Sequence, residues 1–203
     1  MPPKPIIIKP KLNPKPKSTN RRPIGKPMAS FGVIQYKKGS HVIINKYLRR
    51  VGSSRIEDAP TSGVEGDHAL MLRKIRDIDA TMRLRGDGDL YKVLFRGCGY
   101  IDFGIRSTNF EDLKNLEGKT KIWWGYTSTT TNETVAKRYC KGVYIVINTL
   151  SGTGLFNMRD FSGLSCQGED EVLIERGTKY CIDSVEQEED KVKVTVTLQA
   201  KCE

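Results

Sequence analysis

The sequence has 203 residues, of which 34 are Lys or Arg and 24 are Asp or Glu; its formal net charge is +10 and its pI is about 9.4. A chain of this length is expected to form one domain, or one domain with a tail. It holds no apolar run near the roughly 20 residues that span a bilayer, which excludes a transmembrane protein. The early apolar run Ile6–Ile8 is too short for a secretory signal, so we expect no Sec-type export.

The positive charge is concentrated at the N-terminus. Residues 1–30 hold eight basic residues, no acidic residue and eight of the nine prolines, which leaves a net charge of +2 for residues 31–203. A segment of this composition has little to bury and repels itself, so we expect a disordered basic arm at 1–30 and one folded domain at 31–203. The arm contains no aromatic side chain for base stacking. We therefore favour a linker or solvated tail over an arm that binds nucleic acid or a membrane.

The predicted elements divide the domain into a helical part and a strand-rich part. A short apolar stretch predicts a helix at 41–48, and the stripe of Met71, Ile75, Ile78 and Met82 predicts another at 66–85. Strands are predicted at 91–95, 122–130, 143–149, 170–174, 180–187 and 191–201, with helices at 109–116 and 131–141. Residues 150–168 are rich in Gly and Ser without a regular period, which indicates a long functional loop. The pattern predicts an α+β fold in which helices precede a mostly antiparallel sheet system.

The cysteines and histidines give no sign of a metal site. Five cysteines, at positions 98, 140, 166, 181 and 202, form no C-x-x-C pair, so neither a zinc site nor a disulfide framework is indicated. We expect reduced thiols, as in a cytoplasm, and no bound metal. His41 and His68 stand in no ligand pattern and are interpreted as incidental.

Three segments carry candidate functional residues. Arg96 ends a predicted strand and is followed by Gly97, so it either aims its guanidinium at a phosphate or carboxylate, or is an ordinary charged strand end. Ser128 lies in a strand rich in hydroxyl groups, where it either fixes another polar side chain or is ordinary strand composition. Glu169 and Glu171 project from the same face of a strand. They are either a solvated edge or a carboxylate pair for a reaction with a cationic transition state.

Taken in this order, the three segments resemble the R-S-E class of mono-ADP-ribosyltransferases. That family has an aromatic-Arg-Gly strand end, a Ser-Thr-Ser strand and a Glu/Gln-x-Glu element. The matching positions here are Arg96, Ser128-Thr129-Thr130 and Glu169-Asp170-Glu171, and Thr130 keeps the hydroxyl of the third serine. The resemblance covers roughly residues 66–203 and implies the ADP-ribosyltransferase fold, with N-terminal helices packed on a mostly antiparallel β-sandwich core. The size and the basic, Pro-rich start are similar to those of bacterial effector toxins.

The resemblance implies NAD as the substrate and assigns a role to each matching residue. Glu171 would stabilise the oxocarbenium-like ribose as nicotinamide leaves, and Ser128 would hold Glu171 in place. Arg96 would bind the pyrophosphate or ribose, and the Gly97 backbone would be a partner for the nicotinamide amide. Thr129 would also contribute to the NAD site. In the loop, Phe156 or Phe161 would either stack on nicotinamide or pack the loop onto the core.

The resemblance also implies an acceptor and partners. Glu169 would orient or deprotonate the acceptor, and since the family uses Glu at this position for arginine, an arginine of a target protein is expected. The implied toxin would leave its producer without a signal peptide, act in the target-cell cytoplasm, and have a cognate immunity protein that occludes the NAD cleft. Two alternatives remain: an NAD glycohydrolase of the same fold, with water as acceptor, and a nucleic-acid-binding protein led by the basic arm.

Overall fold

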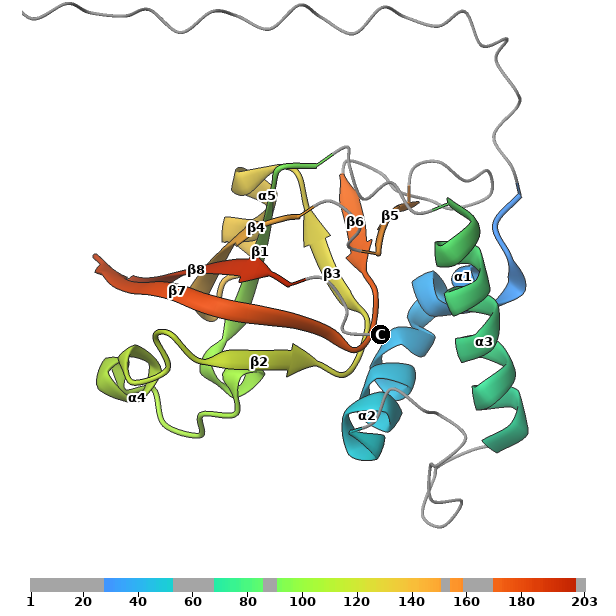
Figure 1. Cartoon of the computed structure of the whole chain (residues 1–203), viewed down its shortest axis with the longest axis horizontal. Coiled ribbons are helices and arrows are strands. Elements are labelled where there is room, and N and C mark those ends of the chain that lie inside the picture. The colour runs from blue at the N-terminus through green and yellow to red at the C-terminus, as the bar shows by residue number, and fades with distance from the viewer. Residues whose placement is uncertain (1–27, 53–67, 86–90, 151–153, 159–169, 200–203) are drawn as a thin grey trace, which may run out of the picture.

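The computed structural model describes residues 28–52, 68–85, 91–150, 154–158 and 170–199 (Figure 1). The helices and helical turns are α1 (Phe31–Gln35), the π-helical turn η1 (Tyr36–Ser40), α2 (His41–Val51), α3 (His68–Arg85), the 3-10 turn η3 (Tyr100–Phe103), α4 (Phe110–Lys114) and α5 (Glu133–Arg138). The strands are β1 (Val93–Gly99), β2 (Thr120–Trp123), β3 (Thr127–Thr130), β4 (Gly142–Asn148), β5 (Leu155–Asn157), β6 (Glu171–Ile174), β7 (Thr178–Glu188) and β8 (Lys191–Leu198).

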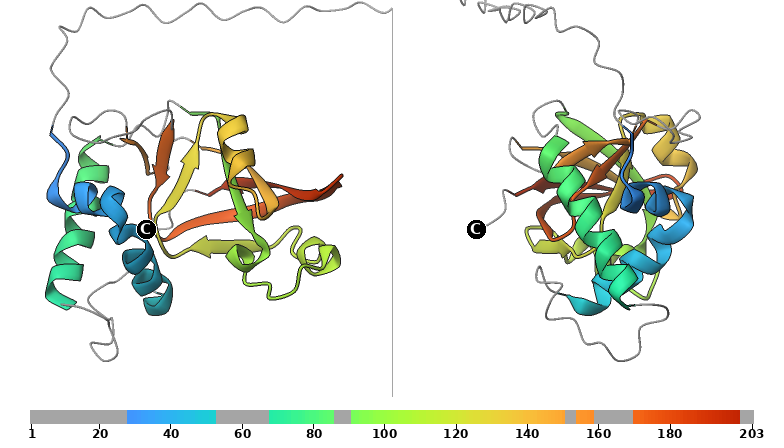
Figure 2. Two further views of the ribbon diagram at one scale, coloured as in Figure 1. Left: turned by 180° about the vertical axis from the view of Figure 1, so that it is seen from behind. Right: turned by 90° about the vertical axis from the view of Figure 1, so that its right-hand side faces the viewer.

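The eight strands are hydrogen-bonded in the order β2-β7-β8-β4-β1-β3-β6-β5. Every adjacent pair is antiparallel except β4 and β8, which are parallel. In Figure 1, β2, β7 and β8 run across the view while β3 and β6 stand steeply against them, so the sheet folds over on itself. Figure 2 shows helices α1 to α3 covering one end of this sheet system. The predicted α+β class, with helices first and a mostly antiparallel sheet after them, is confirmed.

Two hydrophobic cores hold these layers together. The sheet core combines side chains from both ends of the strand order, among them Val194 of β8 and Ile174 of β6. The helical core contains the whole predicted stripe of α3, with Ile75 and Ile78 fully buried, and it includes Leu173 of β6. Because neighbouring residues of a strand face opposite sides, β6 contributes to both cores and is buried on both faces. This position fixes β6 firmly between the helices and the sheet.

The single strand predicted at residues 122–130 is wrong. The chain forms two strands there: β2 pairs with β7, whereas β3 pairs with β6 and β1. The chain turns between the two strands at Gly125. A Cβ at this position would lie 2.7 Å from the side-chain oxygen of Asn45 on α2, so glycine leaves room for that side chain. Gly125 was the sequence signal for this turn, but the aromatic and β-branched residues on both sides of it favoured a single strand.

Other boundaries also differ from the prediction. β1 continues past Arg96 to Gly99, and β5 forms inside the predicted loop 150–168 by pairing with β6. The short helix α1 was not predicted. α5 is shorter than the helix predicted at 131–141 and begins after Asn132, whose side-chain oxygen accepts from the Thr134 amide at 3.0 Å.

The predicted arm lies outside the described residues except at 28–30. Ala29 is buried in the helical core, so the packed body begins before residue 31. None of the described helices has the length and apolar character that crossing a membrane requires. The cysteines of the described segments, Cys98, Cys140 and Cys181, are free thiols, whereas Cys166 and Cys202 lie outside them.

Candidate active site

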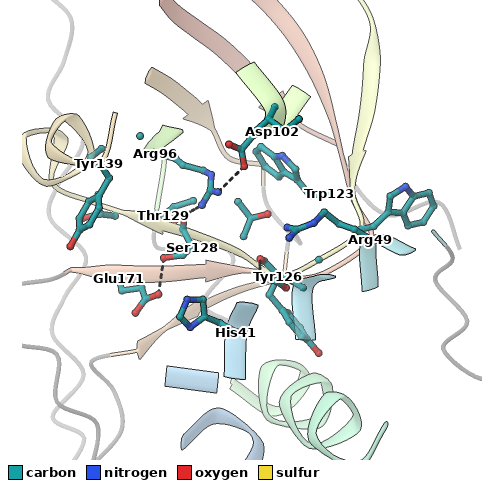
Figure 3. A pocket seen from close by; sticks show the side chains of 18 of the residues that line it. His41, Arg49, Arg96, Asp102, Trp123, Tyr126, Ser128, Thr129, Tyr139 and Glu171 are labelled. Carbon is teal, nitrogen blue, oxygen red and sulfur yellow. Dashed lines mark hydrogen bonds and ion pairs between the residues drawn. The ribbon is translucent and has the colours of Figure 1, made fainter. Parts of the chain in front are cut away.

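A cleft of about 1140 Å³ separates two walls of different construction (Figure 3). The wall from β1, β3 and β6, here called the sheet wall, carries Arg96, Ser128 and Glu171. The wall from η1 and α2, here called the helical wall, carries Tyr36, Lys37, His41, Asn45 and Arg49. The cleft therefore brings the three principal candidate residues together with a set that the sequence motifs do not contain.

Glu171 is the first residue of β6, and it is buried, with 11% of its side chain exposed. It lies on the same face of the strand as Leu173, which packs in the helical core, so the carboxylate points toward the helical wall. The Ser128 hydroxyl donates to Glu171 Oε1 at 2.7 Å, and the Lys37 ammonium lies 2.5 Å from Oε2. Each carboxylate oxygen is thus held by a different wall of the cleft.

The contact between Ser128 and Glu171 follows from strand register. β3 pairs antiparallel with β6, and Ser128 lies opposite Leu173, two residues beyond Glu171. Diagonal neighbours of this kind are within reach of a long side chain, so the Glu171 carboxylate meets the Ser128 hydroxyl. Thr129, at the next position of β3, donates its hydroxyl to the Val172 carbonyl at 2.6 Å and so also links β3 to β6. The sheet therefore brings together residues that are 43 positions apart.

Arg96 links β1 to β3 and to the turn that follows β1. Its Nη1 donates to the Ser128 carbonyl at 2.7 Å, and its Nη2 lies 3.2 Å from Asp102 Oδ1. Asp102 Oδ2 accepts from the Gly99 amide at 3.1 Å, which fixes this carboxylate. A guanidinium has five N–H donors, so these contacts leave donors for an anion in the cleft. Arg96 lies in the middle of β1 rather than at its end, the position that the sequence predicted.

Gly97 also lines the cleft, and the reason for glycine at this position is close packing. A Cβ there would lie 2.2 Å from the Ala136 carbonyl oxygen of α5, a distance that requires the backbone to shift. Glycine therefore allows the end of α5 to pass directly over β1.

The loop candidates have different outcomes. Phe156 lies on β5 with 1% exposure in the helical core, and it is not one of the described residues that line the cleft. Of the two roles that the sequence left open for it, the structure supports packing. Phe161 and Glu169 lie outside the described residues.

The residues of the helical wall were missed by the sequence motifs. Asn45 Nδ2 donates to the Tyr36 hydroxyl at 2.9 Å and to the Tyr126 carbonyl at 3.0 Å, which joins the two walls. Burial raises the pKa of Tyr36 to about 12, although the hydrogen bond from Asn45 acts to lower it. His41, interpreted as incidental, lies on this wall with its ring 5.8 Å from that of Tyr36. The sequence did contain a signal, because the polar residues at positions 41, 45 and 49 are four residues apart and therefore lie along one side of a helix.

A buried ion pair fixes the helices to the sheet. The Arg176 guanidinium binds both oxygens of Asp79, with an Nη2 to Oδ2 distance of 2.7 Å, and the Tyr126 hydroxyl donates to Asp79 Oδ1 at 2.5 Å. Burial, together with the Asp79 carboxylate, raises the pKa of Tyr126 well above its usual value. Since Tyr126 directly precedes β3, this network sets where α3 lies relative to the sheet wall. Among the described residues, no three His, Cys, Asp or Glu side chains gather as metal ligands would.

This fold is that of an ADP-ribosyltransferase. The family of ADP-ribosyltransferase exoenzymes matches residues 31–202, and the chain belongs to this family. No curated protein matches the sequence significantly.

Solved structures of bacterial toxins share the fold at low sequence identity. Plx2a, an ADP-ribosyltransferase toxin from Paenibacillus larvae, is 22% identical over 83% of this chain and 84% of its own, with a TM-score of 0.62. The C3 exoenzyme from Clostridium limosum is 21% identical over 83% of each chain, with a TM-score of 0.64. C3stau2 from S. aureus, solved with NAD, is 18% identical over 84% of this chain and 85% of its own, with a TM-score of 0.65.

Proposed function

We propose that this protein cleaves NAD between nicotinamide and ribose and transfers the ADP-ribose to an arginine side chain of a target protein. The observation that carries the proposal is the Glu171 carboxylate, buried at the cleft wall and held at Oε1 by the Ser128 hydroxyl at 2.7 Å. C3stau2, which shares this fold, is known with NAD. The family membership of the chain agrees with the reaction.

The chemistry of the first half-reaction suits these residues. As the bond between the ribose C1′ and the nicotinamide nitrogen breaks, its electron pair leaves with neutral nicotinamide and the ribose becomes oxocarbenium-like. A fixed carboxylate beside that ribose stabilises the developing positive charge without first having to reorient. Glu171 supplies this carboxylate, and Ser128 keeps it oriented.

Two arginines provide charge for the rest of the substrate. The NAD pyrophosphate is anionic, and Arg96 and Arg49 reach the cleft from the sheet wall and the helical wall (Figure 3). A guanidinium binds phosphate oxygens through paired hydrogen bonds, so each is a suitable ligand. We assign the pyrophosphate to the space between them.

The acceptor proposal depends on the sequence. Glu169 lies two residues before Glu171, and a glutamate there would attract a guanidinium and accept its proton. The balanced second half-reaction forms a bond from a guanidinium nitrogen to C1′ of the ribose and passes one proton from that nitrogen to Glu169. Arginine transfer therefore needs both glutamates, whereas NAD cleavage needs only Glu171.

The test of the cleavage step is the Glu171→Gln variant, which keeps the size of the side chain and removes its charge. We expect release of nicotinamide from NAD to fall by about 10²–10³-fold, as when a residue that stabilises transition-state charge is removed. The matched control is Glu186→Gln, at an exposed position on β7 outside the cleft. Retention of more than a tenth of wild-type release by Glu171→Gln would overturn the proposed function.

The acceptor is tested with Glu169→Gln and a small guanidinium compound, agmatine. The wild-type protein should form ADP-ribosyl-agmatine, and the variant should lose this product but still release nicotinamide. An NAD glycohydrolase is the second candidate, because the geometry of Glu171 and Ser128 alone suits cleavage with water as acceptor. Free ADP-ribose as the sole product of the wild-type protein, with agmatine and with a bacterial lysate, would favour the glycohydrolase.

The biological role that we propose is that of a bacterial toxin acting in the cytoplasm of a target cell. The family membership and the toxins of the same fold support it. Expression of the wild-type protein inside bacterial cells should stop growth, and Glu171→Gln should not. A gene product that restores growth and competes with NAD for the cleft would be the immunity protein.

A further inference from the structure

Two adjacent lysines of the π-helical turn η1 point in different directions. Lys38 is exposed, whereas Lys37 is half-buried and its ammonium lies 2.5 Å from Glu171 Oε2. The turn contains Gly39 at a φ of 115°, a left-handed conformation that favours glycine. The helical path is therefore interrupted at Gly39, where the chain kinks before α2 begins. Here the turn places a cation against the carboxylate that we assign to NAD cleavage.

This contact conflicts with the reaction if it persists. The oxocarbenium-like ribose must lie beside the Glu171 carboxylate, but Oε1 accepts from Ser128 and Oε2 is paired with Lys37. A second positive charge next to the same carboxylate opposes the one that develops on the substrate. The Lys37 ammonium and the oxocarbenium-like ribose therefore compete for Glu171 Oε2.

We propose that Lys37 is the resident counter-ion of Glu171 and that the nicotinamide-ribosyl cation of the substrate displaces it. The inference rests on the proposed function. In the free protein, Lys37 compensates the charge of Glu171, whose side chain is only 11% exposed and would be costly to bury without a partner. When NAD binds, the flexible lysine side chain exchanges Oε2 for an anionic oxygen of the substrate. Lys37 thus sets how strongly the site favours a positively charged nicotinamide ring.

The other groups near Glu171 do not take over this role. The Tyr36 hydroxyl has a pKa raised to about 12 by burial, so it stays neutral at physiological pH. The Arg96 guanidinium is directed to the Ser128 carbonyl and to Asp102. Among the described residues, Lys37 supplies the ammonium in contact with the catalytic carboxylate.

The experiment compares Lys37→Met with Lys38→Met, which removes the same charge one residue away at an exposed position. The probes are carba-NAD, which carries the cationic ring on a sugar that is not cleaved, and its neutral dihydronicotinamide form. Affinities are measured by quenching of tryptophan fluorescence, since Trp123 and Trp124 line the cleft. We expect Lys37→Met to raise the affinity for carba-NAD relative to the neutral form by about tenfold, because the cationic ring no longer competes with the Lys37 ammonium for the Glu171 carboxylate. Lys38→Met and Lys37→Arg should keep the wild-type ratio.

A ratio for Lys37→Met within twofold of wild type would overturn the inference. If Lys37→Met fails to fold, Lys37→Gln replaces it with the same expectation. The two cations act through one carboxylate, so Lys37→Met should change the ratio by less than twofold in a protein that already carries Glu171→Gln. A tenfold change in that background would also contradict the inference. These are binding measurements, so they are independent of the cleavage assay that decides the proposed function.

Discussion

The sheet wall and the helical wall of the cleft hold their functional residues by different means. On the sheet wall, Arg96, Ser128 and Glu171 are 32 and 43 positions apart and are aligned by backbone pairing of β1, β3 and β6. On the helical wall, Tyr36, Lys37 and Asn45 reach the cleft from one short segment and are positioned by side-chain contacts. Backbone register fixes the first set, whereas the fit between layers fixes the second.

The difference shows where the site is rigid and where it depends on tertiary contacts. A one-residue shift of β6 would turn Glu171 away from the cleft, and burial of β6 on both faces opposes such a shift. The helical wall has no comparable register, because it meets the sheet through the side chains of Tyr36 and Asn45. Helix α3, which shares the helical core with this wall, is joined to the sheet by the network of Asp79, Arg176 and Tyr126. Loss of these contacts should therefore affect the helical wall first.

The largest effect is expected from Asp79→Ala, which removes the carboxylate that links α3 to the sheet wall. Asp79 is 3% exposed, and the variant leaves the Arg176 guanidinium and the Tyr126 hydroxyl without this partner. Breaking a buried pair from one side costs about 3–5 kcal/mol, and we expect the free energy of unfolding to fall by this amount. Urea unfolding followed by circular dichroism measures it.

The control for this loss is Asp183→Ala, at an exposed position where the carboxylate accepts from the Thr197 hydroxyl at 2.6 Å. We expect that variant to change the free energy of unfolding by about 0.5 kcal/mol or less. Similar losses from the two variants would mean that the buried network does not stabilise the packing of α3 on the sheet wall.

The next effect is confined to the sheet wall. Ser128→Ala removes the hydroxyl that donates to Glu171 Oε1 at 2.7 Å, but leaves the strand backbone in place. A hydrogen bond to a charged group contributes about 1.5–3 kcal/mol, so we expect kcat for nicotinamide release to fall by about 10- to 100-fold with KM little changed. Steady-state kinetics with NAD separate these two constants.

A matched control is Ser184→Ala, because Ser184 also donates to a glutamate, Glu186, at 3.0 Å, but on the exposed part of β7. That variant should have wild-type kinetics. A large rise in KM for Ser128→Ala with kcat unchanged would show that Ser128 binds the substrate instead of orienting Glu171.

The sequence predicted the sheet wall better than the helical wall for a physical reason. Alternate residues of a strand point to the same face, so the sequence around Ser128 and around Glu171 was enough to place each of them on a predicted strand. The end of β1 was predicted too early because glycine disfavours strands. Gly97 is nevertheless part of β1, since only glycine leaves room for the Ala136 carbonyl of α5, a contact that no local pattern reveals.

The helical wall depends on partners that are distant in the sequence. Lys37 and Lys38 are the same residue type, and neighbouring helical positions point about 100° apart, so one of them faces Glu171 and the other faces solvent. Which of the two faces the carboxylate is decided by how the helix packs on the sheet. Asp79 was a usable signal, because a charge beside the apolar stripe of α3 needs a partner. That partner, Arg176, lies 97 residues away and could not be identified from the helix.

The smallest effect concerns Tyr36, which lies between the two walls, and it is measured as the pH dependence of the free energy of unfolding. Tyr36 accepts from Asn45 and donates to the Tyr126 carbonyl at 3.4 Å, and burial raises its pKa from the usual 10 to about 12. Folding therefore favours the neutral phenol, and the stability that it contributes is fully present below pH 10 and is lost as the pH rises toward 12. Between pH 8 and pH 10.5 this single group should reduce the free energy of unfolding by about 0.8 kcal/mol.

Tyr36→Phe cannot ionise at this position, so its stability should fall less steeply over the same pH range than that of the wild-type protein. At pH 8 the variant should be less stable by about 1 kcal/mol, the usual value of a lost hydrogen bond, and by pH 10.5 most of this gap should have closed. Urea midpoints at pH 8, 9.5 and 10.5 measure the gap, with Tyr139→Phe as an exposed control. The other buried tyrosines ionise in both proteins and cancel in the difference. Parallel curves for wild type and Tyr36→Phe would mean that Tyr36 ionises equally in the folded and unfolded states, and that the helical wall is less tightly closed over the sheet wall than its contacts indicate.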